Sequence, residues 1–281
     1  MLAGLLNGKA ISPQQPAIHI DDRGLLYGDG VFETMLLRDG RVRFIDDHLH
    51  RLQQGCERLK MSPPVIGQLR EELQQLVQQH RDGIVKLILT RGRGGRGYRA
   101  VAGDATRLWQ LFAPVASVGG GVSLRWCDTR LARNQALAGI KHLNRLEQVL
   151  AQSEWDDATI NEGLMLDTES ELISGTMGNV FLVLENVLVT PDLRFCGVQG
   201  VMRKNILRFA AALELPCEER AVRPEELHAA SEVFITNAVR GIQPVTTLLP
   251  SILNGQQWTV GETTLRLITK LNECHQENHA S

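Results

Sequence analysis

Only six of the 30 basic residues in this 281-residue chain are lysines, and one of the six has an unusual local context. Lys141 follows Ala138, Gly139 and Ile140 and precedes a segment with a helical pattern. The small residues before it indicate a strand end or a tight loop, from which a lysine can point into a cleft. In an apolar or cationic environment a lysine amine becomes a nucleophile that forms Schiff bases and carries protons. The same residues also fit a solvated surface lysine, so the position alone leaves both interpretations open.

A glycine- and arginine-rich stretch runs from Arg91 to Tyr98, after a predicted strand. Its four glycines let the backbone approach an anion, and arginines bind carboxylates through two parallel hydrogen bonds. Four arginines, counting Arg99, precede the next acidic residue, Asp104, which favours an anionic substrate. The spacing of a phosphate-binding Walker loop is absent. A flexible basic loop is the alternative interpretation.

Other candidate sites carry weaker signals. His48 and His50 lie on a predicted helix, where a two-residue spacing points the side chains about 200° apart. They are poorly placed to share a metal ion, and we interpret both as structural. The five scattered cysteines form no Cys-x-x-Cys pair, which argues against a zinc site or a disulfide framework. We therefore expect no metal site.

The composition narrows the class of partner. The chain has 30 basic and 32 acidic residues, a balance that argues against binding nucleic acid through a broad basic surface. No apolar run reaches the about 20 residues that cross a bilayer. The first seven residues lack the basic start and the apolar length of a signal peptide. We expect a cytoplasmic protein that acts on a small molecule, without nucleic-acid or membrane partners.

Strand and helix patterns alternate along the chain and predict an α/β fold with two domains, over residues 1–115 and 122–281. The run Gly119–Gly121 indicates a linker at about 116–121. Asp39-Gly40, between apolar runs at 31–37 and 42–45, predicts a β-hairpin. Further strands are expected at 17–20, 84–90, 108–115, 122–126, 162–166, 180–184 and 233–236. Helices are expected at about 46–60, 65–79, 144–152, 202–213 and 263–274.

Longer motifs give the chain a family resemblance. Residues 22–34, DRGLLYGDGVFET, resemble the N-terminal signature of the fold-type IV pyridoxal-phosphate enzymes. These include the branched-chain and D-amino-acid aminotransferases and the aminodeoxychorismate lyases. Residues 48–52 are similar to the helix that carries the family's phosphate-binding arginine, and residues 91–98 and 139–150 look like the lyase branch in particular. The resemblance extends from about residue 5 to 250 and implies a smaller N-terminal and a larger C-terminal α/β domain, in a homodimer.

The resemblance implies a role for each matched position. Lys141 would hold pyridoxal 5′-phosphate as a Schiff base and then act as general acid and base. The cofactor phosphate would be bound at a helix N-terminus, where backbone N–H groups attract anions. The remaining implied positions are Arg51, Gly200, Val201, Met202, Asn237 and Ala238 for the phosphate, Val198 beside the ring, and Arg91, Arg96 and Arg145 for the substrate.

One position departs from the family pattern. The family usually places a glutamate, paired with the pyridine nitrogen, before the glycine of a Gly-x-x-x-Asn motif, but this chain has Ser174 before Gly175. A carboxylate keeps that nitrogen protonated and the ring strongly electron-withdrawing, whereas a serine can only exchange a hydrogen bond. Ser174 therefore disfavours transamination more than it disfavours a lyase reaction, which gains driving force from forming an aromatic ring.

The resemblance thus implies conversion of 4-amino-4-deoxychorismate to p-aminobenzoate and pyruvate, a step toward folate. The two carboxylates of this substrate fit the arginines of the glycine-rich stretch. The alternative is a fold-type IV aminotransferase that acts on D-amino or branched-chain amino acids. A binding protein that kept the scaffold without catalysis is a third possibility, which Lys141 and Arg51 argue against.

Overall fold

The computed structural model describes residues 1–14, 18–100, 103–115, 119–250 and 254–280. The chain divides into two compact units, Met1–Ala116 with Ile140–Asn144, and Ser117–Gly139 with Arg145–Ser281. The sequence predicted a single domain over 122–281, whereas Ile140–Asn144 packs with the first unit. The centre of the expected linker, 116–118, and residue 17 of the first expected strand lie outside the described residues. The rest of that strand was wrongly predicted, because residues 18–20 form no strand.

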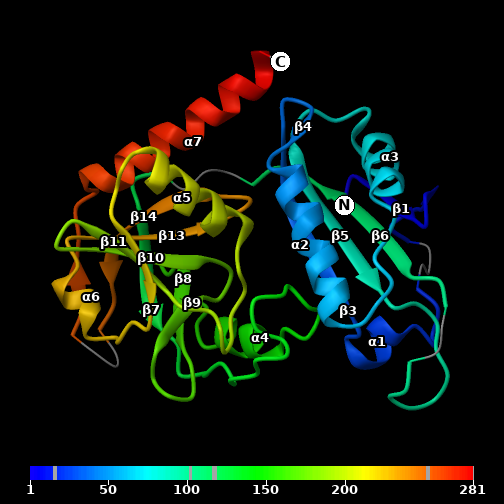
Figure 1. Cartoon of the computed structure of the whole chain (residues 1–281), viewed down its shortest axis with the longest axis horizontal. Coiled ribbons are helices and arrows are strands. Elements are labelled where there is room, and N and C mark those ends of the chain that lie inside the picture. Colours follow the sequence, from blue (N-terminus) through cyan, green and yellow to red (C-terminus); the bar gives the residue numbers. More distant parts are fainter. Residues whose placement is uncertain (15–17, 101–102, 116–118, 251–253, 281) are drawn as a thin grey trace. The chain divides into compact units, whose positions relative to one another are not determined.

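The first unit is built on a six-stranded antiparallel sheet (Figure 1). Two helices, α2 (Ile45–Arg58) and α3 (Ile66–Val77), pack on it, and a short α1 (Arg23–Tyr27) precedes its central strands. The strand order is β2 (Lys9–Ala10), β1 (Ala3–Leu6), β6 (Thr106–Phe112), β5 (Gly83–Thr90), β3 (Gly30–Arg38) and β4 (Arg41–Val42).

The period-2 alternation of these strands sorts their side chains to two faces of the sheet. One face is buried in a core formed with apolar residues of α2 and α3. Phe32, Thr34 and Lys86 belong to the other face, which is only half buried. Thr34 and Lys86 lie directly opposite each other on β3 and β5.

The Asp39-Gly40 hairpin prediction is confirmed, because Leu37 pairs with Val42 and Arg38 with Arg41 around that turn. Asp39 and Gly40 both have positive φ, 51° and 78°, as a two-residue turn between twisted strands requires. The prediction that the returning strand reaches residue 45 was wrong. Phe44 takes a left-handed conformation (φ 53°), and α2 begins directly after it.

The second unit contains a nine-stranded mixed sheet. Its main path runs through β12 (Cys217–Arg220), β11 (Val187–Pro191), β10 (Asn179–Leu184), β13 (Glu232–Asn237), β14 (Gly241–Leu248), β7 (Val122–Trp126), β8 (Glu162–Leu166) and β9 (Leu172–Gly175), and β15 (Gln256–Gln257) pairs with β14. The helices are α4 (Leu146–Gln152), α5 (Val201–Ala212), α6 (Glu226–Ala229) and α7 (Glu262–Ala280). The α/β prediction is confirmed.

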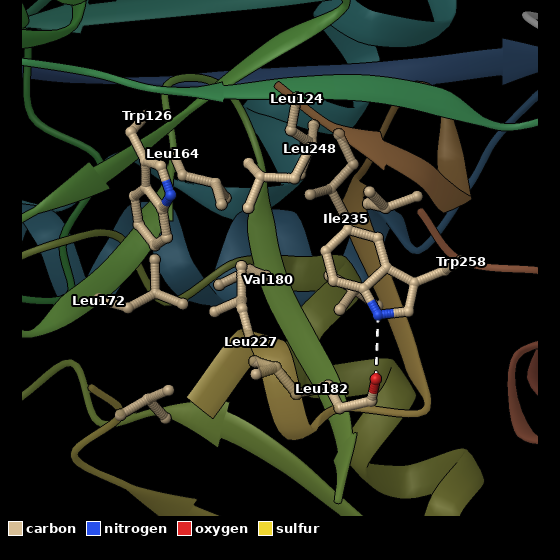
Figure 2. Close-up of a cluster of buried hydrophobic side chains, with 14 of the residues drawn as sticks. Leu124, Trp126, Leu164, Leu172, Val180, Leu182, Leu227, Ile235, Leu248 and Trp258 are labelled. Carbon is tan, nitrogen blue, oxygen red and sulfur yellow. Dashed lines mark hydrogen bonds between the residues drawn. The ribbon is translucent and has the colours of Figure 1, made fainter. Parts of the chain in front are cut away.

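A cluster of buried apolar side chains holds the second sheet together (Figure 2). Trp126 and Leu164 are fully buried, and Trp258 closes the cluster by donating its indole N–H to the Ala230 carbonyl at 2.9 Å. The strands predicted at 122–126 and 162–166 are observed with those bounds. The described residues contain no disulfide.

No helix among the described residues combines the length and the apolar character needed to cross a bilayer. The described residues also gather no group of three or more His, Cys, Asp or Glu side chains that could hold a metal ion.

Candidate active site

Lys141 is fixed against the start of β3 in the first unit. The Phe32 N–H donates to the Lys141 carbonyl at 2.9 Å, and the Leu143 N–H donates to the Gly30 carbonyl at 3.0 Å. Residues 141–143 therefore run beside β3 as a short additional pairing, with Val31 opposite His142. As the sequence indicated, the segment lies at a strand-like end that leads into a helix, α4, which begins at Leu146.

The Lys141 side chain contacts an aromatic ring. Its Nζ lies 4.3 Å from the centroid of the Phe32 ring, and Lys86 Nζ lies 5.5 Å from the same centroid. Each distance falls within the range of cation–π attraction. Two ammonium groups thus lie around Phe32, and neither of these contacts could be inferred from the local sequence of Lys141.

A buried ionic cluster begins at Glu33, the residue after Phe32. Glu33 accepts hydrogen bonds from Arg51 Nε at 2.8 Å and Arg51 Nη2 at 2.5 Å. His48 Nδ1 lies 2.6 Å from Glu33 Oε2. Burial of Glu33 opposes its ionisation, but the charge of Arg51, together with the interactions of His48 and Arg51 with the carboxylate, outweighs that effect and lowers its pKa to about 2. Glu33 is therefore a permanent anion at neutral pH.

His48 is fully buried, whereas His50 is exposed. Burial lowers the pKa of His48 despite the opposing charge of Glu33, and the positive charges of Arg51 and Lys141 lower it further. A neutral imidazole that faces a carboxylate through Nδ1 carries its proton on that nitrogen. His48 Nε2 then presents a lone pair, and no described residue bonds to it.

Arg51 was expected to bind the cofactor phosphate. The structure directs its Nε–H and one Nη2–H at Glu33, so an arriving phosphate has to use other hydrogens of the guanidinium. The bidentate contact fixes the plane of the guanidinium. The arginine is thereby held in one orientation.

The start of α5, in the second unit, carries further groups that can bind a phosphate. The first helical bond runs from the Lys204 N–H to the Gly200 carbonyl, so the N–H groups of Val201 and Met202 precede the hydrogen-bond ladder. No side chain of a described residue caps this helix at Gly200. A helix N-terminus with open N–H groups is an intrinsic anion site.

Asn179, at the start of β10, shapes this helix start. Its side-chain amide donates to the Val198 carbonyl at 2.9 Å, and its Oδ1 lies so close to Gly200 that a Cβ there would overlap it. Asn179 also pairs with Thr236, the residue before Asn237. Val198, Gly200 and Asn237 are thus gathered around Asn179 at one end of the sheet.

Asn237 has a structural task of its own. Its Oδ1 accepts the N–H groups of Val239 at 3.0 Å and Arg240 at 2.8 Å, which forms the turn between β13 and β14. Ala238 lies in this turn. Ser174 is buried on β9, opposite Met165, and the turn after β9 leads to Asn179.

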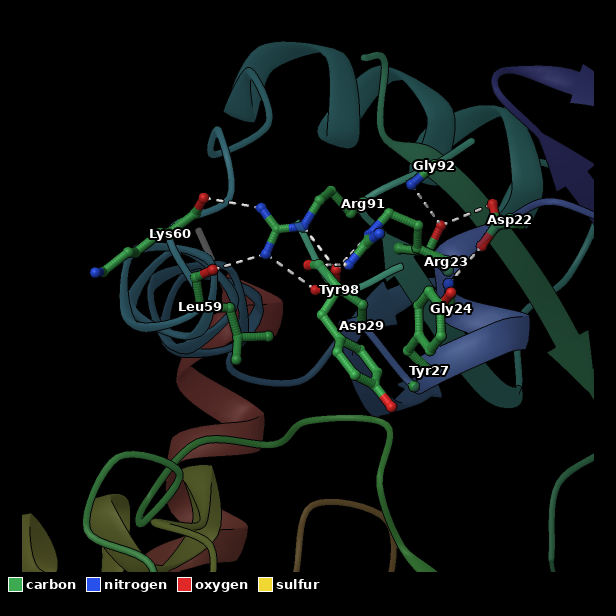
Figure 3. A network of polar contacts seen from close by, with 12 residues as sticks. Asp22, Arg23, Gly24, Tyr27, Asp29, Leu59, Lys60, Arg91, Gly92 and Tyr98 are labelled. Atoms are coloured by element: carbon green, nitrogen blue, oxygen red, sulfur yellow. Dashed lines mark hydrogen bonds and ion pairs between the residues drawn. The ribbon is translucent and has the colours of Figure 1, made fainter. Parts of the chain in front are cut away.

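Of the expected substrate arginines, Arg91 is already engaged by protein groups (Figure 3). It donates to both carboxylate oxygens of Asp29, at 2.7 and 3.0 Å, and to the carbonyls of Leu59 and Lys60 at the end of α2. Burial opposes ionisation of Asp29, but Arg91 and Arg23 outweigh it and lower its pKa. Arg91 therefore connects the glycine-rich stretch to Asp29 and to the end of α2.

Arg23 orders the same stretch from α1. It donates to Asp29 at 2.8 Å and to the carbonyls of Gly97 and Tyr98 at 3.0 and 2.9 Å. The loop is thus held at several points, which argues against the flexible basic loop that the sequence left open. Arg96 is exposed, and no described residue forms a hydrogen bond or an ion pair with it.

Arg145, the remaining expected substrate residue, belongs to the second unit and immediately precedes α4. Burial lowers the pKa of its guanidinium to about 10, although Glu147 opposes the shift. Even that pKa leaves Arg145 charged at neutral pH. A largely desolvated cation of this kind binds a carboxylate more strongly than an exposed one does.

Sequence reasoning missed Phe32, Glu33 and Lys86 and treated His48 as structural. A signal for Glu33 was present. Val31, Glu33, Met35 and Leu37 share the buried face of β3, so the pattern places one carboxylate among apolar residues. A buried carboxylate needs a cation or several hydrogen-bond donors, and the predicted helix that follows supplied Arg51.

Comparisons with known proteins identify relatives of this chain. The profile of a family described as "Amino-transferase class IV" matches residues 30–248. An aminodeoxychorismate lyase of Vibrio harveyi is 30% identical over 92% of this chain and 97% of its own. A putative branched-chain-amino-acid aminotransferase of Methanocaldococcus jannaschii is 29% identical over 95% and 94%. The crystal structure of 4-amino-4-deoxychorismate lyase from Pseudomonas aeruginosa matches with a TM-score of 0.89 and 42% identity, over 96% of this chain and 98% of that one.

Proposed function

Because the chain belongs to the amino-transferase class IV family, we propose that it is a pyridoxal-phosphate-dependent lyase that converts 4-amino-4-deoxychorismate to p-aminobenzoate and pyruvate. The observation that carries the proposal is the placement of Lys141, whose backbone is paired to β3 and whose ammonium lies on the Phe32 ring. The 42% identity to a lyase of this specificity supports the choice of substrate.

The side chains present suit pyridoxal 5′-phosphate. When bound, this cofactor supplies an aldehyde that bonds to an amine and a ring that withdraws electrons from the bonded carbon. Lys141 Nζ would form the covalent bond. Arg51, the N–H groups of Val201 and Met202, and the Asn237–Ala238 turn would hold the phosphate, while the crowding of Gly200 by Asn179 leaves room for only a glycine at the helix start.

Two positions would contact the cofactor ring. Val198 would pack beside it, and Ser174 would face its nitrogen with a hydroxyl group instead of a carboxylate. We therefore expect Ser174→Glu to change the absorption spectrum and affinity of the bound cofactor. A variant with lower lyase turnover but unchanged spectrum and affinity would show that Ser174 does not contact that nitrogen.

Lys141 moves the protons of the reaction. Lys141 Nζ would take the proton from C4 of the substrate as a general base. The bond between C3 and the enolpyruvyl oxygen breaks, and a proton delivered by Lys141 to the enolpyruvyl methylene carbon completes pyruvate. The proton lost at C4 balances the proton gained by pyruvate, and the carbocycle becomes aromatic.

Cationic side chains would bind the two substrate carboxylates. Arg96 and Arg145 are the arginines we assign to direct contact, because the donors of Arg91 are directed at Asp29 and at backbone carbonyls. Arg91 would then act by holding the loop that carries Arg96. We also propose that the enzyme is cytoplasmic and works as a homodimer. Light scattering of the purified protein would test whether it is a dimer.

A second candidate is an aminotransferase of D-amino or branched-chain acids, which the likeness to the Methanocaldococcus jannaschii protein favours. The two reactions leave different products. Purified protein loaded with pyridoxal phosphate would be given aminodeoxychorismate, and p-aminobenzoate would be quantified by chromatography, with Lys141→Ala as the control. Product that requires Lys141 supports the lyase. A new amino acid from an amino-donor and 2-oxo-acid pair, without p-aminobenzoate, would establish the aminotransferase instead.

A further inference from the structure

The second unit buries a carboxylate that no step above uses. Glu162, the first residue of β8, is 1% exposed. No cation among the described residues forms an ion pair with it. A buried carboxylate without a cation has to be stabilised by hydrogen bonds, so the donors that face Glu162 show what it holds in place.

Those donors come mainly from the turn that follows Ser174 and Gly175. The N–H groups of Thr176 and Met177 donate to Glu162 Oε1 and Oε2, at 3.0 and 3.2 Å. The Thr176 hydroxyl also donates to Oε1 in a short hydrogen bond. Gly175 lies against the same side chain, because a Cβ at that position would come within 3.0 Å of Glu162 Cγ.

The contact continues to α4. The side-chain amide of Gln152 donates to the Thr176 oxygen, whose own proton is directed at Glu162. A threonine hydroxyl carries one proton and two lone pairs, so it can form both bonds at once. Gln152 ends the helix that follows the Lys141–Arg145 segment in the chain.

We propose that Glu162 is a positioning residue for the cofactor, acting through the turn between Ser174 and Asn179. It fixes the turn at Thr176 and Met177, midway between Ser174, assigned to the ring nitrogen, and Asn179, which bonds to Val198 and lies against Gly200. Loss of this anchor frees both ends of the turn. The inference rests on the proposed function, because it presumes that Ser174 and Gly200 face the cofactor.

The chain offers a closely matched control in the same unit. Glu232 is also a buried carboxylate without a cation among the described residues. It too accepts two successive N–H groups and a threonine hydroxyl, from Thr263 at 3.0 Å and from Thr264 at 2.8 and 2.6 Å. These bonds hold the start of α7. Glu232 lies at the other end of β13 from Asn237, so it shares the chemistry of Glu162 without the connection to the cofactor site.

The test compares Glu162→Gln, Glu232→Gln and Thr176→Val as apoproteins titrated with pyridoxal phosphate. The dissociation constant, the visible circular dichroism of the bound cofactor and the thermal midpoint of the apoprotein are measured. We expect Glu162→Gln to raise the dissociation constant about tenfold, the effect of losing one charge-assisted hydrogen bond, and to change the dichroism. Thr176→Val should shift both in the same direction. Glu232→Gln should lower the thermal midpoint but leave the dissociation constant within about twofold of the parent protein.

Two results would overturn the inference. One is a Glu162→Gln protein that keeps the parent dissociation constant and dichroism, and the other is an equal change of both in Glu162→Gln and Glu232→Gln. Either would make Glu162 merely structural while the parent protein still binds the cofactor. A parent apoprotein that does not bind pyridoxal phosphate would instead refute the proposed function, and this inference with it.

Discussion

Lys141 and Phe32 are in contact at two points: the Phe32 N–H donates to the Lys141 carbonyl at 2.9 Å, and the Lys141 ammonium lies 4.3 Å from the centroid of the Phe32 ring. The hydrogen bond fixes the position of the Lys141 backbone, and the contact with the ring fixes the position of Lys141 Nζ. Since Glu33 follows Phe32 directly, the same strand also carries the anion that orients Arg51. One short stretch of β3 thus positions the proposed covalent amine and a proposed phosphate ligand.

Phe32→Leu removes the ring but keeps the apolar side chain and the backbone pairing. A cation–π contact contributes about 0.5–2 kcal/mol, so we expect cofactor affinity to fall by about twofold to thirtyfold. Titration of the apoprotein with pyridoxal phosphate measures this. Phe112→Leu, at a half-buried phenylalanine of β6, is the control and should bind the cofactor like the parent protein. Equal affinities for all three proteins would contradict a role for the ring.

The ion pairs of Glu33 should make stability depend on acid. The folded pKa of about 2 lies below the ordinary value of 4.5, so this stabilisation is complete above about pH 4.5 and is lost as pH falls toward 2. Glu33→Gln should lower the unfolding free energy at pH 7 by about 3 kcal/mol, because it leaves a buried cation unpaired.

Urea unfolding of the parent and Glu33→Gln apoproteins between pH 7 and pH 2.5 checks the Glu33 prediction. The gap between their free energies should be constant above about pH 4.5 and shrink below it. Asp46→Asn, which breaks an exposed ion pair with Arg70, should cost less than about 1 kcal/mol. A gap that does not change with pH would show that Glu33 is not ionised through its pairing.

Arg91→Ala should lower the stability of the protein, whereas Arg96→Ala should weaken substrate binding. Arg91 anchors Asp29 and the end of α2, so its loss should lower the thermal midpoint of the protein. Arg96→Ala should leave the midpoint unchanged and raise KM for aminodeoxychorismate by roughly tenfold to a hundredfold, as loss of a charge-assisted bond to a carboxylate predicts. Steady-state kinetics and thermal denaturation separate the two. A stable Arg96→Ala protein with the parent KM would remove Arg96 from the substrate site.

Gly200→Ala should weaken cofactor binding without unfolding the second unit. The new Cβ would overlap Asn179 Oδ1, which forces the start of α5 away from β10. We expect the dissociation constant of pyridoxal phosphate to rise at least tenfold. Gly67→Ala is the control, since that exposed glycine of α3 has open space around it and an alanine there favours the helix. Parent-like binding by Gly200→Ala would place the phosphate elsewhere.

The sequence predicted features that depend on neighbouring residues. The Asp39-Gly40 hairpin follows from a turn type that needs positive φ at both central residues, and the strands at 122–126 and 162–166 follow from short apolar runs. The helix expected at 202–213 is observed one residue earlier at each end, after Gly200. The strand expected at 42–45 was wrong, because the backbone conformation of Phe44 ends it and no local residue type signals this.

Contacts between distant parts of the chain were not predictable in the same way. Lys141 owes its position to a strand more than 100 residues earlier, and its own segment carries no mark of that pairing. Arg91 looked like a substrate ligand because its partner, Asp29, is 62 positions away. Where a partner is remote, the type of a residue indicates which chemistry it can do, while the fold decides whether it does that chemistry.

The central claim, that Lys141 carries the cofactor, has a direct test. Purified protein loaded with pyridoxal phosphate would be reduced with borohydride, which makes the bond between cofactor and lysine permanent, and its peptides would be analysed by mass spectrometry. The chain has only six lysines, so the modified residue can be assigned without ambiguity. We predict the pyridoxyl mass on the peptide that contains Lys141 and its absence from Lys141→Ala. Modification of Lys86 or another lysine in the parent protein, with Lys141 unmodified, would contradict the account.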